Sequence, residues 1–203
     1  MKESLVLSVV ILLLNAFPAY DTTAAKVIDE INLARTNPQK YVEYLQEWKS
    51  HYVGRSVKLP DSRCLRTKEG VPAVDEAIEY MKKRAPIEPL VHSRGMDRAA
   101  GLMVKLQGAT TQIGHHTPDG RGVSDRVDAY GQWLHVVGEN ISYGLDDPRQ
   151  IVMLWIIGDG VPNRAHRTNM FRRDFRVAGA AMGPHLAWQV MCVVDFAGGF
   201  ESF

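Results

Sequence analysis

The hydrophobic period of the chain changes once, from that of a helix to that of a strand. Between residues 25 and 48, apolar residues recur every three or four positions, which indicates amphipathic helix. From Phe175 to Ala181 they recur at every second position, and after Gly183-Pro184 a run rich in Val, Trp and Phe extends from Leu186 to Phe196. That pattern is typical of a β-hairpin. Helices early and strands late, without regular βαβ repetition, predict an α+β domain in which helices pack on a sheet.

Breaks in the helical pattern fall at residues that end or begin helices. Asn37-Pro38 divides the first stretch into two helices, because Pro fits the first turn of the second one. Residues 51–71 lack a sustained period and are predicted to be an exposed connector, and residues 109–144 to be loop with a short helix near Ser124. Three further helices are predicted, over residues 74–84, 93–107 and 146–155.

The first residues have the layout of a secretory signal peptide. An apolar run of ten residues, Leu5 to Leu14, is followed by small and polar residues. The run is too short to cross a membrane, which takes about 20 helical residues. Cleavage is expected between residues 19 and 24, which leaves one domain over residues 25–203. An uncleaved anchor or a buried first helix is the alternative.

The charge balance limits the partners of this chain. Lys and Arg total 24 and Asp and Glu total 23, so the formal net charge is +1. A chain without an overall positive field is not expected to bind nucleic acid nonspecifically. No second long apolar run follows the leader, so no transmembrane anchor is expected, and the sequence does not fix the oligomeric state.

Secretion would place the two cysteines in an oxidising compartment. Cys64 lies in a polar stretch and Cys192 in an apolar one. The sequence leaves open whether they pair or remain separate thiols, with Cys192 in the core. Asn140 begins the only glycosylation sequon, in a segment expected to be structurally committed.

Three short strings combine polar side chains with turns, whereas familiar catalytic motifs are missing. The chain has no Gly-x-Ser-x-Gly, phosphate loop, Cys-x-x-Cys or His-Glu-x-x-His string. The polar strings are residues 114–120, 138–140 and 163–170. Two imidazoles and a carboxylate from such strings could form part of a site for Zn²⁺ or another divalent metal with an open position. They could equally form a hydrogen-bonded cluster that only ties the loops together.

The same strings, in this order, resemble the CAP superfamily, which includes cysteine-rich secretory proteins, antigen 5 and plant pathogenesis-related proteins. Gly-His-His-Thr-Pro-Asp-Gly, Gly-Glu-Asn-Ile, and Trp155 followed by Ala-His-Arg-Thr-Asn-Met precede a hydrophobic hairpin. Asn32-Leu-Ala-Arg35 also resembles the family's first-helix signature. The resemblance covers residues 25–200 and is to the compact SCP type. It implies a three-layer α-β-α sandwich with a central cleft lined by two histidines and two acids.

The resemblance assigns two histidines as metal ligands. The family's first histidine stands directly before Thr or Ser, which assigns His116, with His115 as the competing residue. The second histidine is His166. A metal at His116 and His166 would be Zn²⁺ or another divalent ion.

The resemblance assigns the acids less completely. Glu139 is the first acid, and its neighbour Asn140 is expected to line the cleft with it. Many members carry the second Glu three residues after the Trp, where this chain has Gly158. Asp159, one residue further along, is the candidate replacement. If the cleft were catalytic, Glu139 and Asp159 would be its acids.

These features lead to one leading hypothesis and two alternatives. The leading one is a secreted CAP protein that acts by binding rather than by turnover, with a lipid or sterol, a glycan or a protein as ligand, with or without a divalent metal. The first alternative is a metal-assisted peptidase or esterase in which Glu139 is the general base. The second is an interaction protein that uses its outer surface, with a silent cleft. Structural roles are also expected: Arg35 against a buried carboxylate, and Trp155, Trp188 and Phe196 in the core.

Overall fold

The computed structural model describes residues 22–203. Most of the predicted leader, and the first part of the range expected for its cleavage, residues 19–21, therefore lie outside the described residues. Residues 22–36 form a helix, and Ala24, at the end of that range, is buried in it.

A four-stranded sheet forms the middle of the protein, in the order β4-β6-β7-β5. The β4–β6 pair is parallel, and β7 pairs antiparallel with both β6 and β5. The strands are β4 (Val91–His92), β5 (Gly131–Tyr143), β6 (Val177–His185) and β7 (Gln189–Ser202). The predicted hairpin is therefore β6–β7, at the centre of the sheet.

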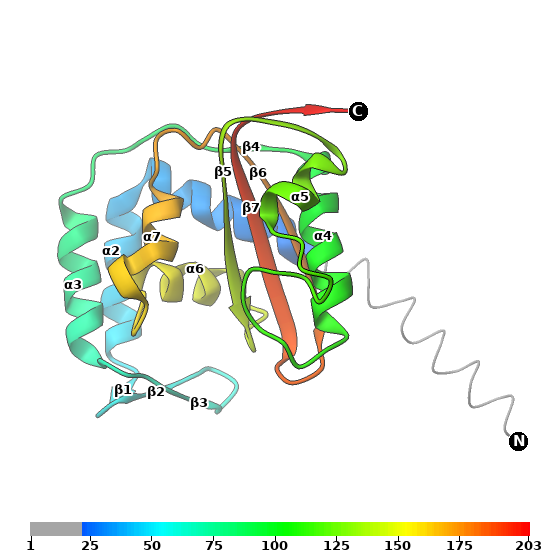
Figure 1. Cartoon of the computed structure of the whole chain (residues 1–203). Helices are drawn as coiled ribbons and strands as arrows, with labels where there is room; N and C mark the ends of the chain where they lie inside the picture. The colour runs from blue at the N-terminus through cyan, green and yellow to red at the C-terminus, as the bar shows by residue number, and fades with distance from the viewer. Residues whose placement is uncertain (1–21) are drawn as a thin grey trace, which may run out of the picture.

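Helices cover both faces of the sheet, which confirms the three-layer α-β-α sandwich (Figure 1). One face carries α4 (Arg94–Gly108) and α5 (Val123–Asp128). The other carries the helix of residues 22–36 together with α2 (Pro38–Lys49), α3 (Val71–Lys82), α6 (Pro148–Ile157), a 3₁₀ turn (Pro162–Arg164) and α7 (Ala165–Met170). Among the described residues, no helix has the length and apolar character needed to cross a membrane.

Local sequence explains where the helices begin and end. Proline occupies the first turn of α2, α3 and α6, where its missing N–H is not needed. Side chains cap two of these helices: Asn37 accepts from the N–H of Lys40, and Asp147 from the N–H of Gln150. Gly158 ends α6 with a φ of 60°, a left-handed conformation that favours glycine.

The core lies mainly between the sheet and the helix layer that includes residues 22–36. Ile31, Leu45 and Ile156 are fully buried there. On the opposite face, α4 approaches β6 closely, because Gly179 has no side chain: a Cβ at that position would overlap the backbone of Met96 and Asp97. This close packing fixes the sheet against α4.

Two predictions of irregular chain were wrong. The connector after α2 contains a small antiparallel sheet of three strands, β1 (Tyr52–Val53), β2 (Ser56–Lys58) and β3 (Cys64–Arg66). The segment predicted as loop up to residue 144 contains the long strand β5, which has a register irregularity between Leu134 and Val137. Both were missed because very short strands, and edge strands rich in Gly and polar residues, lack clean alternation.

Buried Arg35 binds main-chain carbonyls, not the carboxylate that was expected. Its guanidinium donates to the carbonyl oxygens of Glu88, Met170, Arg172 and Phe175 at 2.7–3.2 Å. The arginine therefore joins the first described helix to two other segments, the one that precedes β4 and the one that leads from α7 into β6. Burial, together with the charge of Arg176, lowers the pKa of Arg35 to about 10, so it stays charged at neutral pH.

The burial of several other side chains can be compared with what the sequence predicted. Trp155 and Phe196 are buried as expected, but Trp188 is 50% exposed, because it lies at the β6–β7 turn. Cys64 is exposed and Cys192 is buried, and both are free thiols. Asn140 is fully buried, so its sequon is not open to a glycan.

Candidate functional site

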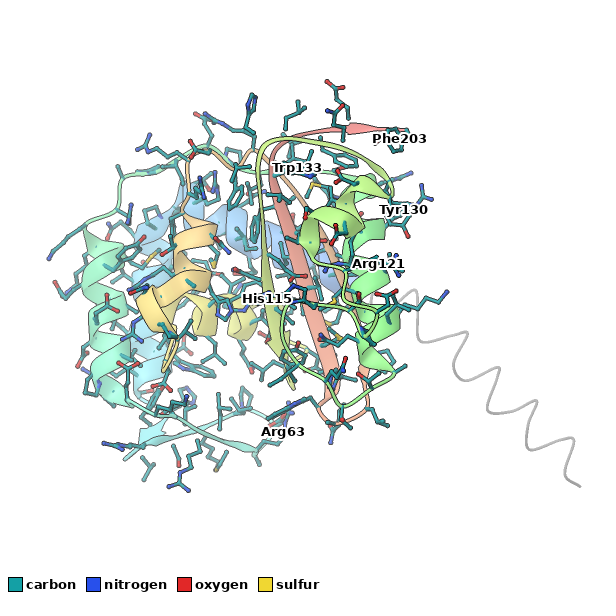
Figure 2. All side chains as sticks on the ribbon, in the orientation of Figure 1. Arg63, His115, Arg121, Tyr130, Trp133 and Phe203 are labelled. Carbon is teal, nitrogen blue, oxygen red and sulfur yellow. The ribbon has the colours of Figure 1, made fainter. Side chains whose placement is uncertain are left out.

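The centre of the site is a pair formed by His115 and Glu139. His115, labelled in Figure 2, comes from the loop between α4 and α5. Glu139 lies within β5. The distance between His115 Nδ1 and Glu139 Oε1 is 2.8 Å. The glutamate side chain is buried, whereas that of the histidine is 56% exposed. The hydrogen bond to Glu139 raises the pKa of His115 and leaves its Nε2 free of this contact.

Two further charged side chains lie beneath this pair. Asp195 on β7 stands directly opposite Glu139 in the sheet register, so both carboxyl groups point to the same face. Arg126 on α5 reaches that face, forms an ion pair with Glu139, and lies 3.4 Å from Asp195 Oδ1 through its Nη2. All three side chains are buried.

The buried cluster distributes its protons unequally. Burial, followed by the charge of Glu139, raises the pKa of Asp195 well above its usual range. Asp195 is therefore the carboxyl group of this cluster whose protonated form is favoured by its surroundings. Arg126 is buried against both carboxyl groups, so its positive charge is not left without a partner, but its Nε and Nη1 and Asp195 Oδ2 form no hydrogen bond within the described residues.

Sequence reasoning missed Arg126 and Asp195. A signal was available for Asp195: a carboxylate inside the apolar run of residues 190–197 must be buried with a partner if the run is a central strand. For Arg126 there was none, because an arginine in a short polar helix is usually exposed.

His166 on α7 completes the site. Burial, and secondly the charge of His115, lower the pKa of His166 to about 4, so its imidazole is neutral at pH 7. Its ring centroid lies 6.2 Å from that of Trp155. Asn140 holds the main chain here, because its Nδ2 donates to the His166 carbonyl at 3.0 Å. Asn169 joins α7 to β5 in the same way, through the Glu139 carbonyl at 3.1 Å.

Two adjoining cavities lie between β3, β5 and α6, and one of them reaches His166. The first has a volume of about 240 Å³ and is lined by His166, Trp155 and Ile141 among others. The second, of about 310 Å³, extends toward Trp188 at the β6–β7 turn. Both cavities are lined by the same three residues, Leu65, Ser142 and Leu154. Together they form a cleft with largely apolar walls and polar groups at one end, as ligand sites commonly do.

Two of the residues predicted for the site have other contacts. His116 is exposed, and the structure gives its side chain no contact with Glu139; its carbonyl accepts from Gln107 Nε2 at 3.0 Å. Asp159 lines the smaller cavity, but its carboxylate accepts from the main-chain N–H groups of residues 68–70. The structure thus brings together His115, Glu139 and His166, with Asn140 behind them.

The donor set allows at most a sparsely ligated metal. Within residues 22–203, no three His, Cys, Asp or Glu side chains surround a common point in a way that could hold an ion. Glu139 already binds His115 with one oxygen and Arg126 with the other. A metal here would therefore have the imidazoles of His115 and His166, with water in its other positions.

Comparison with known proteins assigns the family. The family model described as "Cysteine-rich secretory protein family", CAP, matches residues 28–196. The chain belongs to the CAP family. No curated protein matches the chain in sequence.

Three solved structures similar to this CAP protein are bacterial. An outer surface protein of Borrelia burgdorferi is 20% identical, with a TM-score of 0.48, over 61% of this chain and 86% of its own. An extracellular SCP-domain protein of Bacillus anthracis is 15% identical, with a TM-score of 0.45, over 63% of this chain and 37% of its own. A cysteine-rich secretory protein of Staphylococcus aureus is 12% identical, with a TM-score of 0.42, over 64% and 38%. The family assignment comes from the family model.

Proposed function

We propose that this CAP protein is extracellular and binds a ligand in the cleft beside His115 and His166, without chemical turnover. The observation that supports binding is the state of Glu139. Both of its oxygens are engaged, by His115 and Arg126, so it is not free to serve as a general base. The arrangement instead holds His115 in one orientation against β5.

The chemistry of the cleft narrows the ligand class. His166, which lines the smaller cavity, offers a neutral imidazole with one N–H donor and one acceptor nitrogen. The walls supplied by Ile141, Leu154 and Trp155 are apolar. Such a cleft suits a ligand that joins apolar groups to a hydrogen-bond acceptor. Of the lipid, glycan and protein ligands considered, these walls favour a lipid or a protein over a glycan.

Filling the cleft tests this proposal. Leu154→Trp places a large side chain where the two cavities meet, whereas the matched control Leu186→Ala changes a residue that is 70% exposed and lines neither cavity. We expect the apolar anion 1-anilinonaphthalene-8-sulfonate to bind the wild type and the control equally, and Leu154→Trp at least about tenfold more weakly, or 1.4 kcal/mol. Equal binding to all three proteins would place the ligand surface elsewhere, as a silent cleft requires.

A divalent metal in the cleft is a separate proposal. His115 and His166 would be its protein ligands, and a bound Zn²⁺ would supply Lewis acidity to the ligand. Calorimetric titration with Zn²⁺ tests it in the wild type, in His115→Ala/His166→Ala and in His116→Ala. Loss of binding only in the double variant supports this pair, and loss in His116→Ala supports the pair assigned from the sequence. Equal heats in all three proteins would refute both.

The hydrolase alternative rests on one observation, the carboxylate-oriented imidazole of His115. In that case Glu139 would orient the base and His115 would be the base. Hydrolysis of a panel of esters and peptides by the wild type, abolished in Glu139→Gln, would support catalysis. No hydrolysis above background by the wild type would leave binding as the function.

A further inference from the structure

Strand β3 has an unpaired edge, which follows from its pairing with β2. The N–H of Leu59 donates to the carbonyl of Arg63, and that of Thr67 to the carbonyl of Arg55. Antiparallel pairs alternate between bonded and non-bonded residues, so Leu65 also bonds to β2. The main-chain groups of Cys64 and Arg66 therefore point away from β2.

These outward groups are open within the part of the chain that the structure describes. Within residues 22–203, the N–H and C=O groups of Cys64 and Arg66 have no hydrogen-bond partner. The next N–H in the same row, that of Lys68, is already taken by Asp159 at 2.6 Å. This contact shows that the open edge faces α6 and the cleft. An unpaired edge of this kind readily accepts another strand.

The open edge runs along both cavities of the cleft. Cys64 lines the larger cavity and Arg66 the smaller, while Leu65 between them lines both. A strand laid beside β3 would place residues two positions apart about 6.6–6.8 Å from each other on one face. Alternate side chains of such a strand could thus enter the two cavities.

The arm that carries this edge is basic. Residues 51–68 contain Arg55, Lys58, Arg63, Arg66 and Lys68, against one acid, Asp61. Arg63, labelled in Figure 2 at the end of the arm, pairs with Asp61 at 2.6 Å. The remaining positive charges favour an acidic residue in a strand that lies alongside.

We propose that the ligand of this cleft is an extended peptide segment of another protein, which pairs with Cys64 and Arg66 as an added strand. The proposal rests on the proposed binding function and names its ligand class. Apolar side chains at alternate positions fill the two cavities, and an acidic residue between them faces the basic arm. A lipid would fill the cavities but leave the main-chain groups of the edge without partners, whereas a peptide satisfies both.

Amide exchange of the full chain tests the proposal directly. The probe is the peptide Ac-Thr-Leu-Glu-Leu-Thr-NH₂, added to ¹⁵N-labelled protein. Without peptide, the amides of Cys64 and Arg66 are expected to exchange quickly and that of Leu65 slowly. Saturating peptide should slow exchange at Cys64 and Arg66 by at least about tenfold and leave Leu65 unchanged. Unchanged exchange at the two edge amides with bound peptide would overturn the proposal.

Main-chain pairing is separated from simple apolar binding by a second probe. The same peptide, N-methylated at both Leu and at Glu, keeps its side chains and loses three donors. We expect it to bind at least about tenfold more weakly, which corresponds to 1.4 kcal/mol. Equal affinity of the two peptides would refute strand addition, and this comparison does not depend on any protein variant.

A matched pair of variants examines the protein side. Cys64→Pro removes an outward N–H but no bond to β2, as proline on an edge strand can do. Cys64→Ser keeps the N–H and removes the thiol. Peptide affinity should be at least about tenfold weaker in Cys64→Pro than in Cys64→Ser. Equal affinity of a folded Cys64→Pro protein would contradict the proposal.

Failure of this inference is distinguishable from failure of the proposed function. Dye binding that Leu154→Trp abolishes, together with no binding of the peptide, would keep the cleft as the ligand site and exclude a strand ligand. Binding of neither dye nor peptide would count against both proposals.

Discussion

Acidification should destabilise the protein through His166. The pKa of His166 is lowered to about 4 by burial and by the charge of His115, against 6.5 for an unperturbed histidine. Between these values the unfolded chain binds a proton that the folded protein does not. The contribution of the neutral imidazole to the free energy of unfolding is therefore fully present above pH 6.5 and is lost as the pH falls toward 4.

The size of this effect follows from the shift. Each pKa unit corresponds to about 1.4 kcal/mol. Lowering the pKa of His166 to about 4 therefore contributes roughly 3 kcal/mol to the free energy of unfolding at neutral pH. That is a large part of the 5–15 kcal/mol by which typical domains are stable. His166→Gln, which cannot titrate, should lack this loss.

Urea denaturation of both proteins at several pH values between 7 and 4 measures the effect. Carboxylates contribute to both curves alike, so the difference between wild type and His166→Gln isolates the histidine. We expect the wild type to lose about 3 kcal/mol more than the variant over this range. An NMR titration of His166 should give a midpoint near 4 that rises in His115→Gln, because the second cause is removed. Parallel denaturation curves, or a midpoint near 6.5, would refute the reasoning.

Three further predictions concern buried groups and glycines. Arg35→Lys should lower the free energy of unfolding by about 3 kcal/mol, because an ammonium cannot reach four carbonyls at once; a urea-measured loss below about 1 kcal/mol would contradict this. Glu139→Gln should cost about 3–5 kcal/mol by leaving Arg126 a buried, poorly paired charge, and an unchanged melting temperature would argue against that pairing. Gly179→Ala should destabilise the protein by at least about 2 kcal/mol, because its Cβ would overlap the backbone of α4. Gly101→Ala, whose Cβ would meet only Ala181 at 3.9 Å, should instead stabilise α4 by up to about 1 kcal/mol. The opposite order of melting temperatures would refute the packing argument.

The elements that the sequence predicted are those whose own residues form a continuous apolar face. The helices have such a face, and the β6–β7 hairpin is apolar on both faces, because a helix layer covers each side of these central strands. Strand β5 does not, since Glu139 on one of its faces and Asn140 on the other belong to the site. Its sequence pattern is therefore typical of a loop, and only the pairing with β7 shows that it is a strand.

The candidate site was predicted in outline, and its contacts were not. The strings around His115, Glu139 and His166 could be found, because they combine chemically able residues with turns. The choice between His115 and His116 could not be made, because neighbouring loop residues point in directions that only the fold determines. Asp159 lines the smaller cavity, but the sequence does not show that its carboxylate accepts from the N–H groups of residues 68–70, which precede α3.

The contacts of Arg35 also limit how early during synthesis this protein can fold. Three of its carbonyl acceptors lie 135, 137 and 140 positions further along the chain. During synthesis, the first helix must therefore wait until residue 175 has emerged before its buried charge is satisfied. Closing so long a loop is slow, and it leaves the growing chain without a stable early core. A chain interrupted before Met170 should be readily degraded by proteases, even though every helix up to α6 is present in it.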